Sequence, residues 1–122
     1  MIEHPNKSRS SKKNNLFRVV LRENKKIGWR IAYLVVRDKS VNKLEGHPDS
    51  YESFEPVKGR SLIYLAGAKK ENRIQGFLLD KPVILKKAVW HAVITLTGES
   101  EIKITENSQV KSNYWKLKNI IV

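Results

Sequence analysis

Four residues have the types and spacing expected of a metal or acid–base site. Glu45 and His47 are two positions apart, Glu52 follows after a short turn, and His91 lies far along the chain. Residues two apart share a face of a strand, so Glu45 and His47 point the same way if their segment is a strand. Carboxylate and imidazole donors that converge from two hairpins suit Mn, Fe, Ni or Zn. We therefore interpret Glu45, His47, Glu52 and His91 as ligands of a divalent transition metal.

The same segments offer groups for acid–base chemistry and for binding an acidic substrate. A glutamate such as Glu52 can accept a hydroxyl proton, and His91 can donate a proton if no metal holds it. Cationic side chains can hold a substrate carboxylate. We predict Lys86 as a further catalytic residue and, as substrate-binding residues, Arg30, Arg60 and Lys87. The residues also allow plainer interpretations, with His47 in a surface turn, His91 satisfied in the core, and the lysines solvated.

Composition limits the kind of protein that the chain forms. Its 122 residues are enough for one domain with one continuous core. The chain has no cysteine, which excludes disulfides, thiolate nucleophiles and cysteine-based zinc sites. No apolar run approaches the roughly 20 residues of a membrane span, and no apolar signal segment follows Met1. We therefore expect a single-domain cytoplasmic protein without membrane contact.

Positive charge is concentrated towards the N-terminus. The net charge is +12, and residues 1–30 hold nine Lys and Arg against two Glu, a net of +7, which leaves +5 for residues 31–122. Residues 1–15 contain few apolar side chains, so we predict that they form a flexible basic tail before a barrel domain at residues 16–122. A tail that contacts RNA or DNA is an alternative that we do not favour.

The body of the chain has the periodicity of strands. Eight short runs rich in Val, Ile, Tyr, Phe and Thr are separated by charged breaks and by breaks that contain Gly, Pro or Asn. In SEIKITE, residues 100–106, Ile102 and Ile104 fall on one face and Lys103 and Thr105 on the other. We predict an all-β domain, a small antiparallel barrel or jelly roll, because closure protects strand edges and leaves a mouth for a ligand.

The spacing of the candidate ligands resembles the signature of the cupin superfamily. His47, Glu52 and Gly59 match the second half of the first cupin motif, and Glu45 takes the place of its first histidine. His91 matches the histidine of the second motif, whose usual proline, glycine and asparagine are here Lys86, Ala88 and Thr95. The resemblance implies a small cupin-like antiparallel barrel in which residues 45–59 form the first ligand-bearing hairpin.

Two segments are similar to the ureidoglycolate lyase family of cupin-like barrels. HPDSYESFEPV, residues 47–57, resembles its His-Pro segment followed by Gln or Glu, Phe and Pro, and AVWHAV, residues 88–93, resembles its segment that ends in Trp-His. The similarity spans about residues 28–115, and Ala92 stands where the family often has a second histidine. It implies an enzyme that splits ureidoglycolate, a small acid, into glyoxylate and urea. The alternatives are a non-catalytic cupin that binds a small acid or sugar, and a basic RNA-associated barrel.

The C-terminal run YWKLKNIIV, residues 114–122, bears on the oligomeric state. Three of its last four residues are apolar, and a short barrel leaves strand edges and apolar surface to be covered. We therefore predict a two-fold homodimer in which N- or C-terminal strands extend the sheet of the partner.

Overall fold

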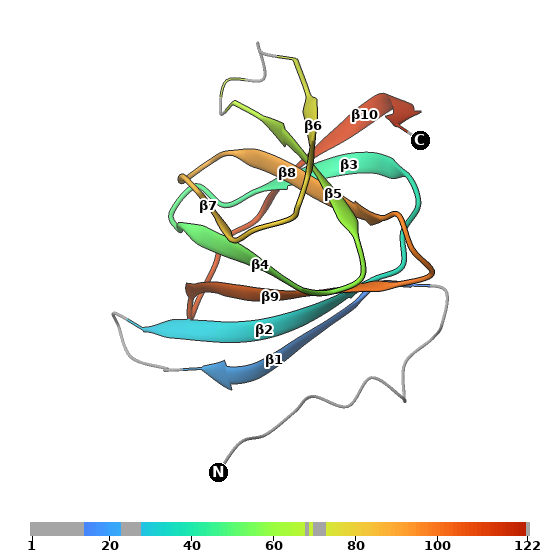
Figure 1. Cartoon of the computed structure of the whole chain (residues 1–122). Coiled ribbons are helices and arrows are strands. Elements are labelled where there is room, and N and C mark those ends of the chain that lie inside the picture. The colour runs from blue at the N-terminus through green and yellow to red at the C-terminus, as the bar shows by residue number, and fades with distance from the viewer. Residues whose placement is uncertain (1–13, 23–27, 68, 70–72, 122) are drawn as a thin grey trace.

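The chain is arranged as two sheets of strands that face each other. The computed structural model describes residues 14–22, 28–67, 69 and 73–121, which form strands and no helix. It follows that no helix in this described part could span a membrane. Figure 1 shows one sheet below and the other above, with the described ends of the chain on different sheets. The predicted all-β antiparallel jelly roll is confirmed.

Each sheet has five strands, and strands distant in sequence lie side by side. The lower sheet has the order β1 (Leu16–Arg22), β2 (Trp29–Val36), β9 (Ser100–Asn107), β4 (Glu52–Lys58) and β7 (Val83–Leu85). The upper sheet has the order β10 (Asn113–Ile121), β3 (Val41–Gly46), β8 (Trp90–Thr95), β5 (Ser61–Ala66) and β6 (Gln75–Leu78). Each of the eight runs that were predicted as strands coincides with one of these strands to within a few residues, while β3 and β4 were not among those runs. The segment at residues 45–59 contains the end of β3 and the whole of β4.

Alternation along the strands builds the core between the sheets. In β9, Ile102 and Ile104 are buried while Lys103 and Thr105 are half-exposed, as the sequence pattern predicted. With Phe54 on β4 and Ile63 on β5, these isoleucines belong to one apolar cluster. Burying such side chains contributes roughly 1.5–3 kcal/mol each to the stability of the fold. This cluster packs beside the buried polar side chains of the interior and holds the two sheets at a fixed separation.

A second apolar cluster lies on the other face of the upper sheet. Trp90 alternates with His91 along β8 and packs edge-on against Trp115 of β10, with ring centroids 5.9 Å apart. Leu44 and Ile94 are buried in the same cluster. The C-terminal strand therefore folds back onto its own sheet, where it pairs with β3. The homodimer stays a prediction.

The predicted basic tail, residues 1–15, lies outside the described residues up to residue 13. Asn15 precedes β1, and its Oδ1 accepts hydrogen bonds from the backbone N–H groups of Arg37 and Asp38 just after β2. Its Nδ2 donates to the carboxylate of Asp38. These bonds tie the start of β1 to the end of β2, and both Asn15 and Asp38 line the cavity between the sheets.

Candidate metal centre

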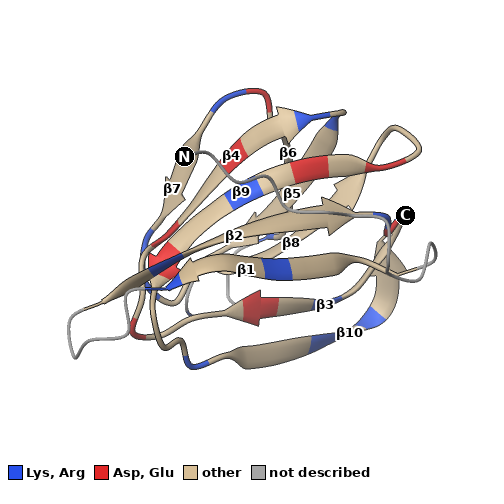
Figure 2. Ribbon diagram, turned by 90° about the horizontal axis from the view of Figure 1, so that it is seen from below, with Lys and Arg blue, Asp and Glu red and all other residues tan. Residues whose placement is uncertain are grey.

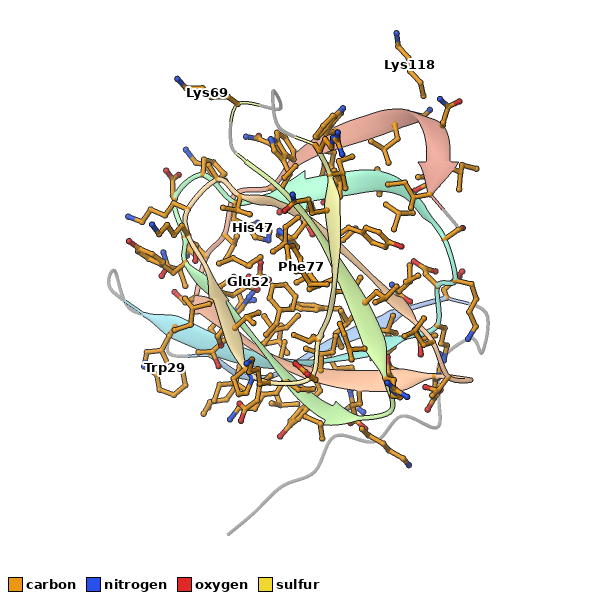
Figure 3. All side chains as sticks on the ribbon, turned by 45° about the horizontal axis from the view of Figure 1, so that its top comes forward. Trp29, His47, Glu52, Lys69, Phe77 and Lys118 are labelled. Carbon is orange, nitrogen blue, oxygen red and sulfur yellow. The ribbon has the colours of Figure 1, made fainter. Side chains whose placement is uncertain are left out.

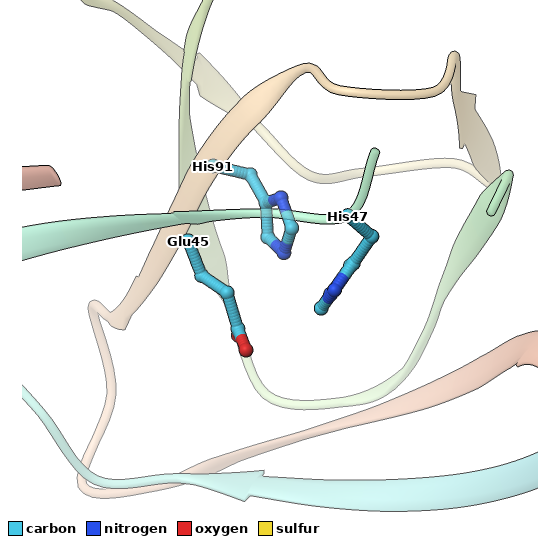
Figure 4. A group of neighbouring side chains, drawn as sticks. All are labelled: Glu45, His47 and His91. Carbon is cyan, nitrogen blue, oxygen red and sulfur yellow. The ribbon is translucent and has the colours of Figure 1, made fainter. Parts of the chain in front are cut away.

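Strand register brings the polar side chains of the site together from both sheets. In the lower sheet, Glu106 on β9 is the direct partner of Arg30 on β2 and of Glu52 on β4. In the upper sheet, Glu45 on β3 is the direct partner of His91 on β8. His47 follows the end of β3 and turns into the same space. Figure 3 shows His47 and Glu52 pointing into the interior between the sheets, and Figure 4 shows Glu45, His47 and His91 around one point.

One carboxylate oxygen lies between the two imidazoles. Glu52 Oε1 is 3.1 Å from His91 Nε2 and 3.3 Å from His47 Nε2. All three residues are buried, and among the described residues no hydrogen bond of standard geometry reaches this oxygen, although both imidazole nitrogens lie beside it. Two ligand atoms, each about 2.1 Å from one metal ion, are about 3.0 Å apart at a right angle and about 3.4 Å apart at the tetrahedral angle. The spacing is therefore that of neighbouring ligands around one ion.

Bonds at the far nitrogens orient both imidazoles. His47 Nδ1 is 3.0 Å from the carbonyl oxygen of Lys111, and His91 Nδ1 is 3.2 Å from that of Val89. A carbonyl only accepts, so each Nδ1 carries the proton. Each Nε2 is then the atom that faces the cluster, and in the neutral ring it presents a lone pair there. This is the arrangement in which histidines bind metals in proteins.

Glu106 is a site residue that the sequence interpretation did not include. Its Oε2 accepts hydrogen bonds from Arg30, at 2.6 Å from Nη2 and 2.8 Å from Nε. Its Oε1 lies 3.9 Å from His47 Nε2 and has no hydrogen-bond partner within the described part of the chain. The alternation of SEIKITE carried the signal, because the buried face of Ile102 and Ile104 continues to Glu106 two positions further on.

Burial and mutual charge shift the pKa values of the cluster. For His47, burial lowers the pKa, but the Glu52 carboxylate beside it has the larger combined effect and raises the pKa to about 9. Burial raises the pKa of Glu52 to about 7, and the charge of Glu106 adds to this shift. Burial lowers the pKa of His91 to about 4. Three buried ionisable groups are thus held in a space where none can be solvated, as at many functional sites.

The cluster lines a cavity of about 430 Å³. Its acidic lining residues are Asp38, Glu45, Glu52 and Glu106, and its basic ones are Arg30 and Lys43. The exposed part of the lining includes Lys43 and Tyr114, and Lys43 Nζ lies 4.8 Å from the centre of the Tyr114 ring. A chain with a net charge of +12 therefore surrounds an acid-rich cavity. Figure 2 shows that strands of both sheets carry Lys and Arg.

The structure brings some of the predicted residues together and places others elsewhere. Glu45, His47, Glu52 and His91 share the cavity, and two overlapping sets of donors there have the spacing of a metal site: Glu45, His47 and His91, and His47, Glu52 and Glu106. Arg30 also lines the cavity, but it is paired with Glu106. Arg60 lies in a separate hollow with Lys58 and Asp80. Exposed Lys86 and Lys87 lie on the turn before β8, where Lys87 stacks over Tyr51. The donors fit a divalent transition metal, because buried, unpartnered carboxylate oxygens need a cation.

Comparison with known proteins identifies the fold and leaves the sequence without a match. No family model and no curated protein matches the chain. An oxalate oxidase solved in complex with the substrate analogue glycolate has a TM-score of 0.69 and 11% identity over 85% of this chain. The chain spans 56% of the length of that enzyme.

Two further structures are similar over much of the chain. A cupin 2 domain-containing protein from Halorhodospira halophila has a TM-score of 0.62 and 12% identity, and the match covers 92% of this chain and 76% of that protein. An oxalate decarboxylase from Bacillus subtilis, studied for its Mn(II) centres, has a TM-score of 0.53 and 15% identity, and the match covers 73% of this chain and 24% of the decarboxylase. The chain therefore has the cupin fold.

Proposed function

We propose that the protein binds one divalent transition metal in its barrel and acts on a small hydroxy acid. The observation that carries the proposal is Glu52 Oε1, a buried carboxylate oxygen without a hydrogen-bond partner, 3.1 and 3.3 Å from the two histidine nitrogens. The ligands in this proposal are His47, His91 and Glu52, with Glu45 beside them. A bound metal would supply Lewis-acid polarisation of a hydroxyl or carboxylate oxygen. The likeness to a decarboxylase with Mn(II) centres supports manganese as the first ion to test.

The cavity suits a small acid. Its volume of about 430 Å³ falls within the usual range for small-molecule sites, which is roughly 300–1,000 Å³. Lys43 lies in the exposed part of the lining, whereas Arg30 is already paired with Glu106. We assign the substrate carboxylate to Lys43. The likeness to an oxidase solved with glycolate supports a hydroxy acid as the ligand class.

Ureidoglycolate cleavage is the first reaction to test, since the motif resemblance implies it. The hydroxyl of ureidoglycolate gives up its proton, the carbon–oxygen bond becomes a carbonyl, the carbon–nitrogen bond breaks, and the departing urea nitrogen takes a proton. Among the cluster carboxylates, half-buried Glu45 is more open to the cavity than Glu52, so it is the better placed acceptor of the hydroxyl proton. Glyoxylate and urea then leave the cavity.

Metal reconstitution tests the first part of the proposal. The purified chain is loaded with Mn, Fe, Ni or Zn and analysed for bound metal, and we expect one ion per chain for the preferred metal. His47→Ala removes a ligand, while Glu55→Gln changes an exposed carboxylate on β4 that pairs with Lys103. The expected result is loss of the metal in His47→Ala alone. Substoichiometric metal that is the same in all three proteins would overturn a metal site.

Substrate tests separate an enzyme from a binding protein. The loaded protein is mixed with ureidoglycolate, and glyoxylate and urea are measured together, with the His47→Ala protein as the control. Equal amounts of both products, dependent on His47, support the lyase. A thermal shift with glycolate or glyoxylate but no product from ureidoglycolate would favour the non-catalytic cupin. RNA binding that is as tight after deletion of residues 1–13, which lie outside the described residues, would favour the basic RNA-associated barrel.

A further inference from the structure

A row of three charged side chains crosses the floor of the cavity. Arg30, Glu106 and Glu52 lie on the neighbouring strands β2, β9 and β4, where the register makes Glu106 the direct partner of both others. Because they occupy one row, their side chains emerge on the same face of the sheet. Two of the three are glutamates with exposed fractions of 5% each. The sheet therefore holds two carboxylates side by side away from water.

The two oxygens of Glu106 have different surroundings. Arg30 binds Oε2 through two of its nitrogens, at 2.6 and 2.8 Å, which holds this oxygen in place. Oε1 points towards the cluster, 3.9 Å from His47 Nε2, and has no hydrogen-bond partner. The side chain of Glu106 is 1% exposed, so water does not replace the missing partner. A carboxylate oxygen is thus presented to the same space as Glu52 Oε1.

The charges of this row are incompletely balanced. Arg30 offsets one of the two buried carboxylates, and the second faces the two imidazoles. Unpaired buried charge costs several kcal/mol per ion, so a metal ion, or a proton held by His47 or by the carboxylates, must offset the second charge. A divalent ion with Arg30 supplies three positive charges, which equals the negative charge of Glu45, Glu52 and Glu106. The site is then neutral with both imidazoles uncharged.

We infer that Glu106 is a ligand of the metal centre and that Arg30 is the residue that positions it. This inference rests on the proposed metal-binding function and adds a ligand from β9, outside the two hairpins that carry the motif residues. His47, Glu52 and Glu106 offer donor atoms that all lie within 4.8 Å of one another. Arg30 also stacks over the Phe17 ring, 5.3 Å from its centre, so a residue of the edge strand β1 packs against the Arg30–Glu106 pair. In this assignment Arg30 does not bind the substrate carboxylate.

Manganese titration of the full-length chain tests the assignment. Mn²⁺ affinity is measured by calorimetry, and the electron paramagnetic resonance spectrum of the bound ion is recorded. Glu106→Gln keeps the shape and removes the anionic oxygen, and we expect its affinity to fall by about 10- to 100-fold, with a changed spectrum. Glu106→Asp keeps the charge but withdraws the oxygen by one carbon, and it should bind with intermediate affinity. Arg30→Lys, which loses the two-nitrogen contact, should weaken binding less than Glu106→Gln.

Control variants separate a local effect from a general one. Glu55→Gln lies on β4 at the exposed face and should bind Mn²⁺ as the unchanged chain does, with the same spectrum. Circular dichroism of the metal-free Glu106→Gln and Glu106→Asp proteins checks that both fold. If Glu106→Gln binds Mn²⁺ with unchanged affinity and spectrum, the two carboxylates merely share a proton and the inference is overturned. If the unchanged chain binds no metal, the proposed function itself fails, and this result is distinct from the first.

Discussion

The two histidines of the site lie side by side, but their surroundings shift their pKa values in opposite directions. Their ring centroids are 5.2 Å apart. His47 has the Glu52 and Glu45 carboxylates near it, which outweigh its burial, while burial dominates for His91. At neutral pH, therefore, His47 carries a proton in the metal-free protein and His91 does not. A metal that enters the site must displace the proton of His47.

This difference predicts how the stability of the metal-free protein depends on pH. The folded pKa of His47, about 9, lies above its ordinary value of 6.5, so its contribution is complete below pH 6.5 and is lost as the pH rises through 9. The pKa of Glu52 is raised from 4.5 to about 7, so its contribution to stability is lost as the pH rises through 7. The pKa of His91 is lowered from 6.5 to about 4, so its titration changes the stability only below pH 6.5. With a chelator present, we therefore expect the urea concentration at the unfolding midpoint to decrease as the pH rises from 6.5 to 9.

Two comparisons check this pH dependence. In His47→Gln the fall between pH 7.5 and 9 should be smaller, because the titrating imidazole is gone. With saturating Mn²⁺ the stabilisation by the metal should grow over the same range, because fewer protons compete for the ligands. A metal-free midpoint that rises with pH, in both the unchanged chain and the variant, would contradict a protonated His47 beside a neutral His91.

The position of Lys43 in the cavity lining predicts an effect on substrate binding that is separate from metal binding. Its ammonium lies in the exposed part of the cavity lining, whereas Lys87 stacks on Tyr51 outside the cavity. Lys43→Met should weaken glycolate binding to the metal-loaded protein by about tenfold, since one charge-assisted contact is worth roughly 1.5–3 kcal/mol before screening by water. Lys87→Met, the matched control, should leave glycolate binding unchanged. Calorimetry decides the comparison, and an equal loss in both variants would remove Lys43 from the site.

The turn from β4 to β5 has a strict local requirement. Gly59 has φ +74°, and a Cβ there would lie 2.7 Å from the carbonyl oxygen of Glu99 and 2.9 Å from Cα of Ser100. The backbone of this turn therefore packs directly against the start of β9. Only glycine meets both the left-handed conformation and the close contact. The glycine of the first motif therefore allows the turn from β4 to β5 to pack closely against the start of β9.

Gly59→Ala should destabilise the protein, and Gly98→Ala is its matched control. A left-handed alanine costs roughly 1–2 kcal/mol before the contact with Glu99 is counted, which corresponds to a melting temperature lower by about 5 °C or more. A Cβ at Gly98 meets nothing within 4 Å. Thermal unfolding of both variants with chelator present gives the comparison. Equal melting temperatures for Gly59→Ala and Gly98→Ala would show that the turn relaxes freely.

Local pattern was sufficient to predict the strands, and it failed to predict how they face one another. Alternation in residues 100–106 placed Ile102 and Ile104 inward, and that inward face extends to Glu106. The partner of Glu106 could not be found in this way, because Arg30 lies 76 residues away and only the register of β2 with β9 brings the two together. Pairing between distant strands is a property of the whole sheet and leaves little trace in either segment.

The lysine that lines the cavity is a second property that the sequence did not reveal. Lys86 was predicted as a catalytic residue and Lys87 as a substrate-binding residue, and neither is among the residues that line the cavity. Lys43 on β3 lines it instead. Position along the chain indicates which segments lie near a candidate ligand, whereas the side chains that line a cavity depend on how the two sheets pack. The cluster itself was predictable, since its spacing matches a known motif.

At the scale of the whole molecule, β1 is an edge of the lower sheet with much apolar surface. Its exposed apolar side chains are Phe17, Val19, Val20 and Leu21. An unpaired edge of this kind pairs readily with another chain. We propose that a second copy of this chain covers it, because antiparallel pairing of one strand with its own copy satisfies two-fold symmetry.

Light scattering tests this pairing at tens of micromolar protein. The expected mass is twice the 14.1 kDa of one chain. Leu21→Lys puts a charge on the β1 edge and should give the mass of one chain, while Ile84→Lys, on the opposite edge strand β7, should leave the dimer intact. A single-chain mass for the unchanged protein excludes the dimer. A dimer in Leu21→Lys that is lost in Ile84→Lys would move the interface to β7.

The proposed ligands come from both sheets, which would give the centre a mechanical role as well as a chemical one. Glu52 and Glu106 lie on strands of the lower sheet, His91 lies on a strand of the upper sheet, and His47 directly follows the upper strand β3. In a chain without cysteine, an ion held by all four would be a removable cross-link between the layers, closing a loop of chain much as a disulfide does. Amide exchange in β3, β4, β8 and β9 would then slow together on metal addition. The lifetime of the folded protein in a cell would follow the supply of one trace element.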